Sequence, residues 1–247
     1  MEDRKLVIIP TYNELENISD IIHAVVELDG GFDVLIIDDQ SPDGTANVVK
    51  KLQKCFPERL HLLERQGKQG LGTAYIEGFE YALQNGYHYI FEMDADFSHN
   101  PKDLLRLYET CSEHGYDMVI GSRYISGVNV VNWPMGRVLM SFFASKYVQF
   151  VTGMPIKDTT AGFVCYHHRV LRAINLEKIK FIGYAFQIEM KFTAWKLGFA
   201  IKEVPIIFTD RTKGTSKMSK HIFKEAIFGV IYMKIKSLFK KYKPNRT

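Results

Sequence analysis

The sequence predicts an α/β fold in which a mostly parallel sheet is flanked by helices. Short continuous apolar runs, such as residues 6–9, are typical of strands that are buried on both faces of a parallel sheet. These runs alternate with segments whose apolar side chains repeat at helical spacing, and this alternation indicates βαβ units. Apolar residues make up 46% and charged residues 24% of the 247 residues, which is ordinary globular usage and excludes disordered, collagen-like and solenoid chains.

The first half of the chain alternates regularly between strand and helix. The expected strands cover residues 6–9, 32–37, 60–63, 89–91 and 118–120. The expected helices cover residues 18–30, 45–54, 73–86 and 104–111. The first helix is indicated by one apolar stripe that consists of Ile18, Ile21, Ile22, Val25 and Val26. Because such a sheet binds ligands beyond the carboxyl ends of its strands, we expect function in the residues that follow each strand.

The second half is less regular. We expect helices over residues 136–152, 184–197 and 221–241, strands over 162–166 and 200–208, and a polar loop over 210–219. Pro205 argues for an edge position of the last strand, because proline cannot donate a ladder hydrogen bond. Lys146 and Lys234 interrupt the two most apolar stretches, so we expect no transmembrane helix. The charged start of the chain likewise indicates no secretory leader.

Charge is unevenly distributed along the chain. Residues 211–247 have a net charge of +10, which leaves −6 for residues 1–210 of a chain whose total is +4. This pattern indicates either a polyanionic partner, nucleic acid or anionic lipid, or a solvated charge run. No aromatic residues alternate with the basic ones as in RNA-binding motifs, so we expect no nucleic acid. Apolar stretches over 138–151 and 222–233, followed by lysines, favour a membrane interface over two core-covering helices.

Carboxylates follow three of the apolar segments. They are Asp38-Asp39, Asp94-Ala95-Asp96 and Asp158. Two acids separated by one residue at a strand end can reach one hard cation, such as Mg²⁺ or Mn²⁺, together with substrate phosphates. The same short pattern also occurs in acidic loops without a metal. His99 lies beside the acidic pair and is a candidate for supporting a metal or a phosphate.

The segments at the strand ends, taken in order, form a recognisable series. They are Pro10-Thr11-Tyr12-Asn13-Glu14, Asp38-Asp39-Gln40-Ser41-Pro42-Asp43-Gly44-Thr45, Gly70-Leu71-Gly72-Thr73-Ala74, Asp94-Ala95-Asp96-Phe97-Ser98 and Gly121-Ser122-Arg123-Tyr124. This series resembles the family-2 glycosyltransferases of the GT-A fold, and among them the dolichyl- or polyprenyl-phosphate mannose synthases without transmembrane helices of their own. The resemblance extends over nearly the whole chain. It implies a Rossmann-like sheet, a catalytic domain over residues 1–210, and a basic acceptor loop with an amphipathic helix over 211–247 in the same domain.

The resemblance also implies roles for individual residues. The nucleotide pocket would be lined by Pro10, Tyr12, Glu14, Ile37 and Asp39. The metal that bridges the diphosphate would be held at Asp94, Ala95 and Asp96, with the two aspartates as its ligands. Further substrate contacts would come from Ser98, Arg123, Arg137, Arg211 and Lys217. Catalysis would depend on Asp96, Arg123 and Arg211.

Other roles for some of these residues stay open. Glu14 can serve the positive end of a helix, Tyr12 can pack a loop, and Arg123 can form a surface ion pair. Asp158 can be a second carboxylate of the site or a loop cap. Val164 stands where many relatives have a basic residue, which weakens a phosphate-binding role for that segment.

The implied reaction is an inverting, Mg²⁺- or Mn²⁺-dependent transfer of mannose from GDP-mannose to a polyprenyl phosphate of the dolichyl type. The products would be a β-mannosyl phosphoryl polyprenol and GDP. The implied location is peripheral, on the cytoplasmic face of a membrane, and a membrane-anchoring subunit is a further partner that the resemblance allows. Two alternatives are a UDP-glucose-dependent polyprenyl-phosphate glucosyltransferase and a non-catalytic subunit that binds nucleotide sugars.

Overall fold

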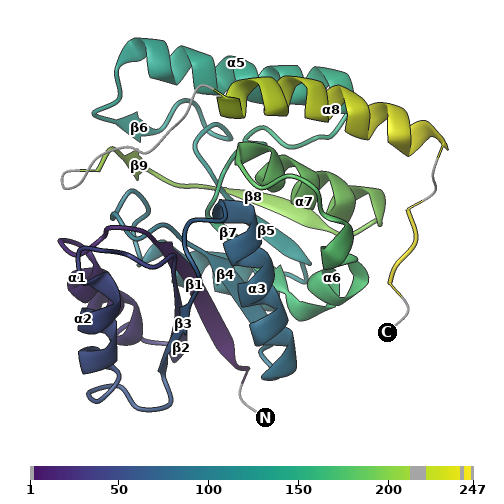
Figure 1. Ribbon diagram of the computed structural model, residues 1–247. Helices are drawn as coiled ribbons and strands as arrows, with labels where there is room; N and C mark the ends of the chain where they lie inside the picture. The colour runs from purple at the N-terminus through teal and green to yellow at the C-terminus, as the bar shows by residue number, and fades with distance from the viewer. Residues whose placement is uncertain (1–2, 212–220, 240–241, 246–247) are drawn as a thin grey trace.

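A computed structural model describes residues 3–211, 221–239 and 242–245 of the chain. Within them, seven strands form one sheet in the order β3-β2-β1-β4-β7-β5-β8 (Figure 1). Its strands are β1 (Lys5–Thr11), β2 (Phe32–Asp38), β3 (Leu60–Glu64), β4 (Tyr89–Glu92), β5 (Met118–Ser122), β7 (Val164–His167) and β8 (Ile201–Pro205). The predicted α/β fold with a mostly parallel sheet is confirmed.

One strand departs from the parallel arrangement. β7 lies between β4 and β5 and is antiparallel to both, whereas the other neighbours in the sheet are parallel. In this register Val164 of β7 lies opposite Glu92 of β4. β8 is at the sheet edge and ends at Pro205, as its proline predicted. The expected strand over 200–208 is in fact two, because β9 (Phe208–Thr209) leaves the sheet and pairs with β6 (Val130–Val131).

Helices cover both faces of the sheet. The helices are α1 (Ile18–Val26), α2 (Thr45–Leu52), α3 (Leu71–Gln84), α4 (Asp103–Ser112), α5 (Met135–Thr152), α6 (His168–Ala173), α7 (Tyr184–Lys196) and α8 (His221–Phe239), with a short 3₁₀ helix, η1 (Leu176–Lys178). Apolar residues of α1, α2 and α4 share one buried cluster with one face of the sheet. Residues of α3, α6 and α7 share a second cluster with the opposite face. Two cores therefore hold the central strands from both sides.

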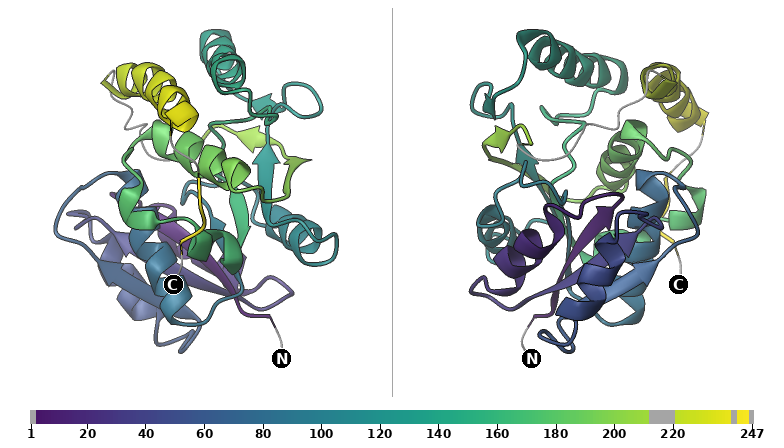
Figure 2. Two further views of the ribbon diagram at one scale, coloured as in Figure 1. Left: turned by 90° about the vertical axis from the view of Figure 1, so that its right-hand side faces the viewer. Right: turned by 60° about the vertical axis from the view of Figure 1, so that its left-hand side comes forward.

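α5 and α8 lie beyond the sheet rather than on one of its faces, as Figures 1 and 2 show. They pack against each other, and α8 also packs against α7. The hydroxyl of Tyr147 on α5 donates to the carbonyl oxygen of Ile227 on α8 at 2.9 Å, and the ammonium of Lys234 donates to the carbonyl oxygen of Thr152 at 3.1 Å. In the described part of the chain, no helix is long and apolar enough to cross a membrane.

Candidate active site

A cavity of about 930 Å³ opens where β1, β2, β4 and β5 end. It collects side chains from the strand ends, from α3, α5 and α7, and from the segment after β9. The predicted site residues that line it are Pro10, Tyr12, Glu14, Asp39, Asp94, Ala95, Asp96, Ser98, Arg123, Arg137 and Arg211. Residues that are far apart in the sequence are thus brought to one place by the parallel strands, which all deliver their carboxyl ends to the same side.

Two predicted residues are not in this group. The side chain of Ile37 is fully buried in the core on the α3 face of β2 and does not line the cavity. The reason is strand alternation: Ile37 still belongs to the doubly covered strand, and the chain turns toward the cavity only after Asp38. Lys217 lies outside the described residues.

The two adjacent aspartates after β2 have different tasks. Asp38 accepts hydrogen bonds from the Thr11 hydroxyl at 2.9 Å and from the backbone and hydroxyl of Ser41 at 2.8 and 2.6 Å, so it fixes the turn. Asp39 lines the cavity and lies 3.1 Å from the guanidinium of Arg65. Burial raises the pKa of Asp39, and the charge of Arg65 opposes this shift. Arg65 therefore keeps a largely buried carboxylate ready for a polar ligand.

The loop after β4 presents two carboxylates to the cavity. Asp96 accepts the backbone N–H of Ser98 at 3.0 Å and pairs with the guanidinium of Arg211 at 2.8 Å. Asp94 keeps 40% of its side chain exposed. Desolvation in the cleft and the neighbouring charge of Asp96 raise the pKa of Asp94 to about 7, because two carboxylates that lie close together repel each other.

His99 supports this loop as a neutral ring. Burial lowers its pKa to about 4, so its Nδ1 accepts the backbone N–H of Asp94 at 3.4 Å. The ring stacks on Phe163, with the ring centroids 4.8 Å apart. Among the described residues, no group of three or more His, Cys, Asp or Glu side chains is placed to hold a metal ion. A cation at Asp94 and Asp96 would thus need substrate oxygens or water to complete its ligand set.

Two arginines that line the same cavity are paired with carboxylates. Arg123 donates to Asp158 through Nε at 2.7 Å and Nη2 at 2.6 Å, and Nη2 also reaches the hydroxyl of Thr160 at 3.0 Å. Asp158 is fully buried, so it is the counter-ion of Arg123 rather than a loop cap. Arg137 pairs with Asp210 at 2.9 Å, and its guanidinium lies 4.1 Å from the centre of the Trp133 ring.

The two-stranded sheet of β6 and β9 positions these arginines. Thr209 donates its backbone N–H to the carbonyl oxygen of Ser98 at 3.2 Å, and Asp210 donates to Val131 at 2.9 Å. These bonds attach the 208–211 segment to the loop that bears Asp96. As a result, Arg211 reaches Asp96 although the two residues are 115 positions apart in the sequence.

The outer wall of the cavity is apolar. It is formed mainly by α5, with contributions from α7 and α8, through Met140, Phe143, Ala144, Tyr147, Val148, Ile188 and Ile227. Several apolar side chains next to this wall face solvent, including Met135 at 69%, Phe150 at 90% and Phe228 at 69% exposure. The cavity lining therefore combines carboxylates, arginines and an apolar wall.

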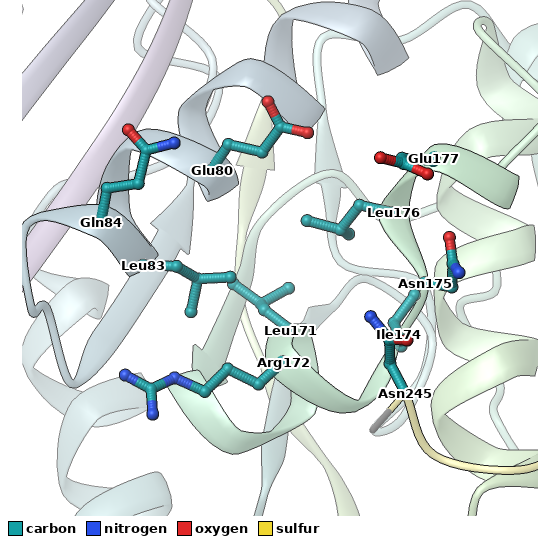
Figure 3. Close-up of a pocket in the computed structure, with 10 residues that line it drawn as sticks. All are labelled: Glu80, Leu83, Gln84, Leu171, Arg172, Ile174, Asn175, Leu176, Glu177 and Asn245. Atoms are coloured by element: carbon teal, nitrogen blue, oxygen red, sulfur yellow. The ribbon is translucent and has the colours of Figure 1, made fainter. Parts of the chain in front are cut away.

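A second cavity, of about 690 Å³, lies between α3, α6, η1 and the end of the described chain (Figure 3). Its lining combines Leu83, Leu171, Ile174 and Leu176 with polar side chains at the rim. None of the predicted site residues that the structure describes lines it. It is separate from the cavity at the strand ends.

Comparison with known proteins identifies the family. The sequence model described as "Glycosyl transferase family 2" matches residues 6–179. The chain belongs to this family. It is 44% identical over 227 residues to a polyprenol monophosphomannose synthase of Mycolicibacterium smegmatis, covering 92% of this chain and 85% of that protein. It is also 44% identical to an undecaprenyl-phosphate mannosyltransferase of Micrococcus luteus, covering 92% of each chain.

Solved structures agree with this glycosyltransferase at the level of the fold. One of them is glucosyl-3-phosphoglycerate synthase from Mycobacterium tuberculosis in complex with Mn²⁺, UDP-glucose and phosphoglyceric acid. It superposes with a TM-score of 0.70 at 15% identity, covering 94% of this chain and 79% of that one. The predicted family and its GT-A fold are thus confirmed, and the chain is an enzyme of the glycosyltransferase class.

Sequence reasoning missed several residues of the glycosyltransferase site. Arg65 follows β3 directly, and Lys68 lies 5.0 Å above the Tyr12 ring, so both stand at a strand end like the predicted aspartates. The search for function after each strand could have found them. Trp133 and Asp210 lie in irregular segments beside β6 and β9, and no periodic pattern in the sequence pointed to them.

Proposed function

We propose that this glycosyltransferase transfers mannose from GDP-mannose to a polyprenyl phosphate of the dolichyl type. The observation that supports this most is the single cavity, which joins carboxylates for a nucleotide diphosphate complex to arginines and an apolar wall that suit a lipid phosphate. The names of the two relatives at 44% identity, a polyprenol monophosphomannose synthase and an undecaprenyl-phosphate mannosyltransferase, support the same class of acceptor and sugar.

The nucleotide would bind where β1 and β2 end. Tyr12 offers an aromatic face for the base, and Asp39, held by Arg65, offers an acceptor for its N–H groups. Pro10 and Glu14 complete this part of the lining. The diphosphate would then extend along the cavity toward Asp94 and Asp96.

A divalent cation fits the residues at the end of β4. Asp94 and Asp96 would be its protein ligands, because both carboxylates line the cavity and the desolvation and mutual repulsion that raise the pKa of Asp94 favour a cation between them. The guanidinium of Arg211 on Asp96 occupies the position of such a charge. When bound, Mg²⁺ or Mn²⁺ would neutralise the charge that develops on the leaving diphosphate. Both ions prefer this set of oxygen ligands.

The acceptor phosphate would bind on the arginine side. Arg123 and Arg137 present planar guanidinium groups that suit phosphate oxygens, and Ser98 and Arg211, which both contact Asp96, line the same cavity. The polyprenyl chain would leave along the apolar wall of α5 and α8. We place the enzyme peripherally on the cytoplasmic face of a membrane, with the exposed apolar residues of these helices in the interface.

The proposed reaction requires no proton transfer from the acceptor to the enzyme. A lipid monophosphate has a second pKa of about 6, so it reaches the site mostly as a dianion at pH 7 and needs no general base. The residues described above would hold the acceptor oxygen in line with the anomeric carbon and the leaving diphosphate on the other side. In-line displacement inverts the configuration, so the product would be a β-mannosyl phosphoryl polyprenol with release of GDP.

The test is direct. The purified protein is incubated with radiolabelled GDP-mannose or UDP-glucose, a short polyprenyl phosphate in detergent, and Mg²⁺ or Mn²⁺. We expect label to enter the lipid fraction from GDP-mannose. Labelling from UDP-glucose alone would establish the glucosyltransferase instead, and binding of either donor without any transfer would indicate a non-catalytic subunit.

A further inference from the structure

A chain of buried hydrogen bonds lies behind the cavity wall. Lys191 on α7 is fully buried, and its ammonium donates to the carbonyl oxygen of Ala161 at 2.7 Å and to Oε1 of Gln187 at 3.0 Å. The amide nitrogen of Gln187 donates in turn to Oε2 of Glu92 at 2.8 Å. Both polar atoms of the Gln187 amide are used, which fixes the orientation of that side chain.

This chain connects the two halves of the active site through the protein interior. Glu92 is the last residue of β4, two positions before Asp94. Ala161 belongs to the loop whose Asp158 holds Arg123. Gln187 and Ala161 themselves line the cavity. Lys191 therefore joins the segment that bears the metal carboxylates to the segment that orients an acceptor-side arginine.

The energetics argue that Lys191 does more than fill space. Lys191 and Glu92 are both fully buried, so neither side chain is hydrated by bulk water and charge on either one is held at a desolvation cost. An apolar pair of similar volume would pack this region at least as well. Charges that are retained in a core despite this cost can instead specify one arrangement of the segments they touch.

We propose that Lys191 is a positioning residue for sugar transfer: through Ala161 and Gln187 it sets the 158–162 loop relative to the Asp94–Asp96 segment. This inference rests on the proposed function. The competing explanation is that Lys191 serves only as a counter-charge for the buried carboxylate of Glu92. The two explanations differ in what happens when that carboxylate is removed first.

The experiment is a double-mutant cycle of Lys191→Met, Glu92→Gln and the combination. In the Glu92→Gln protein, the carboxylate that Lys191 could neutralise is already gone. Adding Lys191→Met to this protein therefore tests the loss of the hydrogen-bond donor to the carbonyl oxygen of Ala161. We expect this second step to lower kcat about tenfold or more, because small misplacements of reacting groups have effects of that size. The Kd for GDP-mannose should change less than about twofold, since the nucleotide residues lie on β1 and β2. Assays run well below the unfolding temperature of each variant.

A second readout does not depend on any reaction. Hydrogen–deuterium exchange of the backbone amides in residues 158–163 should accelerate in the combined variant relative to Glu92→Gln. Equal kcat and equal exchange in these two proteins would overturn the proposal and leave Lys191 as a counter-charge. If Lys191→Met alone does not fold, the comparison of Glu92→Gln with the combination still decides. If the wild-type protein transfers no mannose, the proposed function fails, whereas the exchange experiment still tests Lys191.

Discussion

The donor side and the acceptor side of the cavity are built differently. On the donor side, Asp39 and the Asp94–Asp96 pair stand at the ends of central parallel strands, and short turns with dense hydrogen bonding hold them. On the acceptor side, Arg123 also follows a sheet strand, β5, but Arg137 comes from α5 and Arg211 from the segment after β9. If the nucleotide binds as proposed, the sheet fixes its place, whereas a helix and a loop that can vary independently of the sheet contribute to the proposed acceptor region.

The two sides also differ in the state of their charges. The donor side has an excess of carboxylates, and the charge of Asp96 contributes to the raised pKa of Asp94. The acceptor-side arginines each pair with a carboxylate: Arg123 with Asp158, and Arg137 with Asp210. We therefore expect the donor side to attract a cation, and the acceptor side to hold its arginines in a fixed geometry for a phosphate. Arg211 bridges the two sides through Asp96.

The largest effect is expected on the donor side. Asp96→Ala should abolish transfer, because loss of one of two carboxylates from a metal–diphosphate site costs about 3 kcal/mol or more of transition-state stabilisation, a factor of at least about a hundred. EDTA should stop the wild-type enzyme, and added Mg²⁺ or Mn²⁺ should restore it. The assay is the initial rate with labelled GDP-mannose.

The matched control for this substitution is Asp103→Asn. Asp103 lies at the start of α4, away from the cavity lining, and pairs with Arg106 of the same helix at 2.7 Å. It should keep the wild-type rate. An Asp96→Ala protein with the activity of this control would show that the donor side holds no catalytic metal.

A smaller but still strong effect is expected from the residue that bridges the two sides. Arg211→Ala should lower kcat by about ten- to a hundredfold if its guanidinium contacts phosphate in the transition state. If the ion pair with Asp96 has a purely structural role, its loss should lower the free energy of unfolding and leave kcat near the wild-type value. The measurement is kcat in detergent, which removes any contribution of vesicle binding. Arg106→Ala, which breaks an exposed ion pair on α4, is the control.

A near-normal kcat for Arg211→Ala would show that Arg211 does not link the donor side to the acceptor side in catalysis. The segment after β9 would then be structural, and the phosphate-binding role would rest on Arg123 and Arg137 alone.

The donor side could be predicted from the sequence to a greater extent than the acceptor side. The strand ends of the donor side were predictable. An apolar run indicates each strand, and the acidic segments Asp38-Asp39 and Asp94-Ala95-Asp96 indicate where two of these strands end. Ile37 was the exception, since its inward direction depends on where the strand turns. The pairing of Arg123 with Asp158 and of Arg137 with Asp210 was not predictable, because residues 35 and 73 positions apart meet only through tertiary structure. The antiparallel β7 was missed for the same reason: a four-residue strand has no sequence signal for its direction.

The smallest effect is expected at the membrane surface of the acceptor side. Lys236 lies on α8 among exposed apolar residues that include Ile235 and Leu238. A lysine near an anionic membrane is worth about 1 kcal/mol, so Lys236→Ala should weaken association with vesicles that contain anionic lipid by about fivefold at low salt. Sedimentation with such vesicles measures this change, and it should fade as the ionic strength rises. Lys51 is an exposed lysine on α2, and Figure 1 shows this helix at the other end of the molecule from α5 and α8, so Lys51→Ala should bind like the wild type. Activity in detergent should be the same for all three proteins, because the lipid surface is then absent. Equal vesicle binding of Lys236→Ala and the wild type at low salt would show that α8 does not face the membrane, and the apolar wall would then serve only the lipid chain of the acceptor.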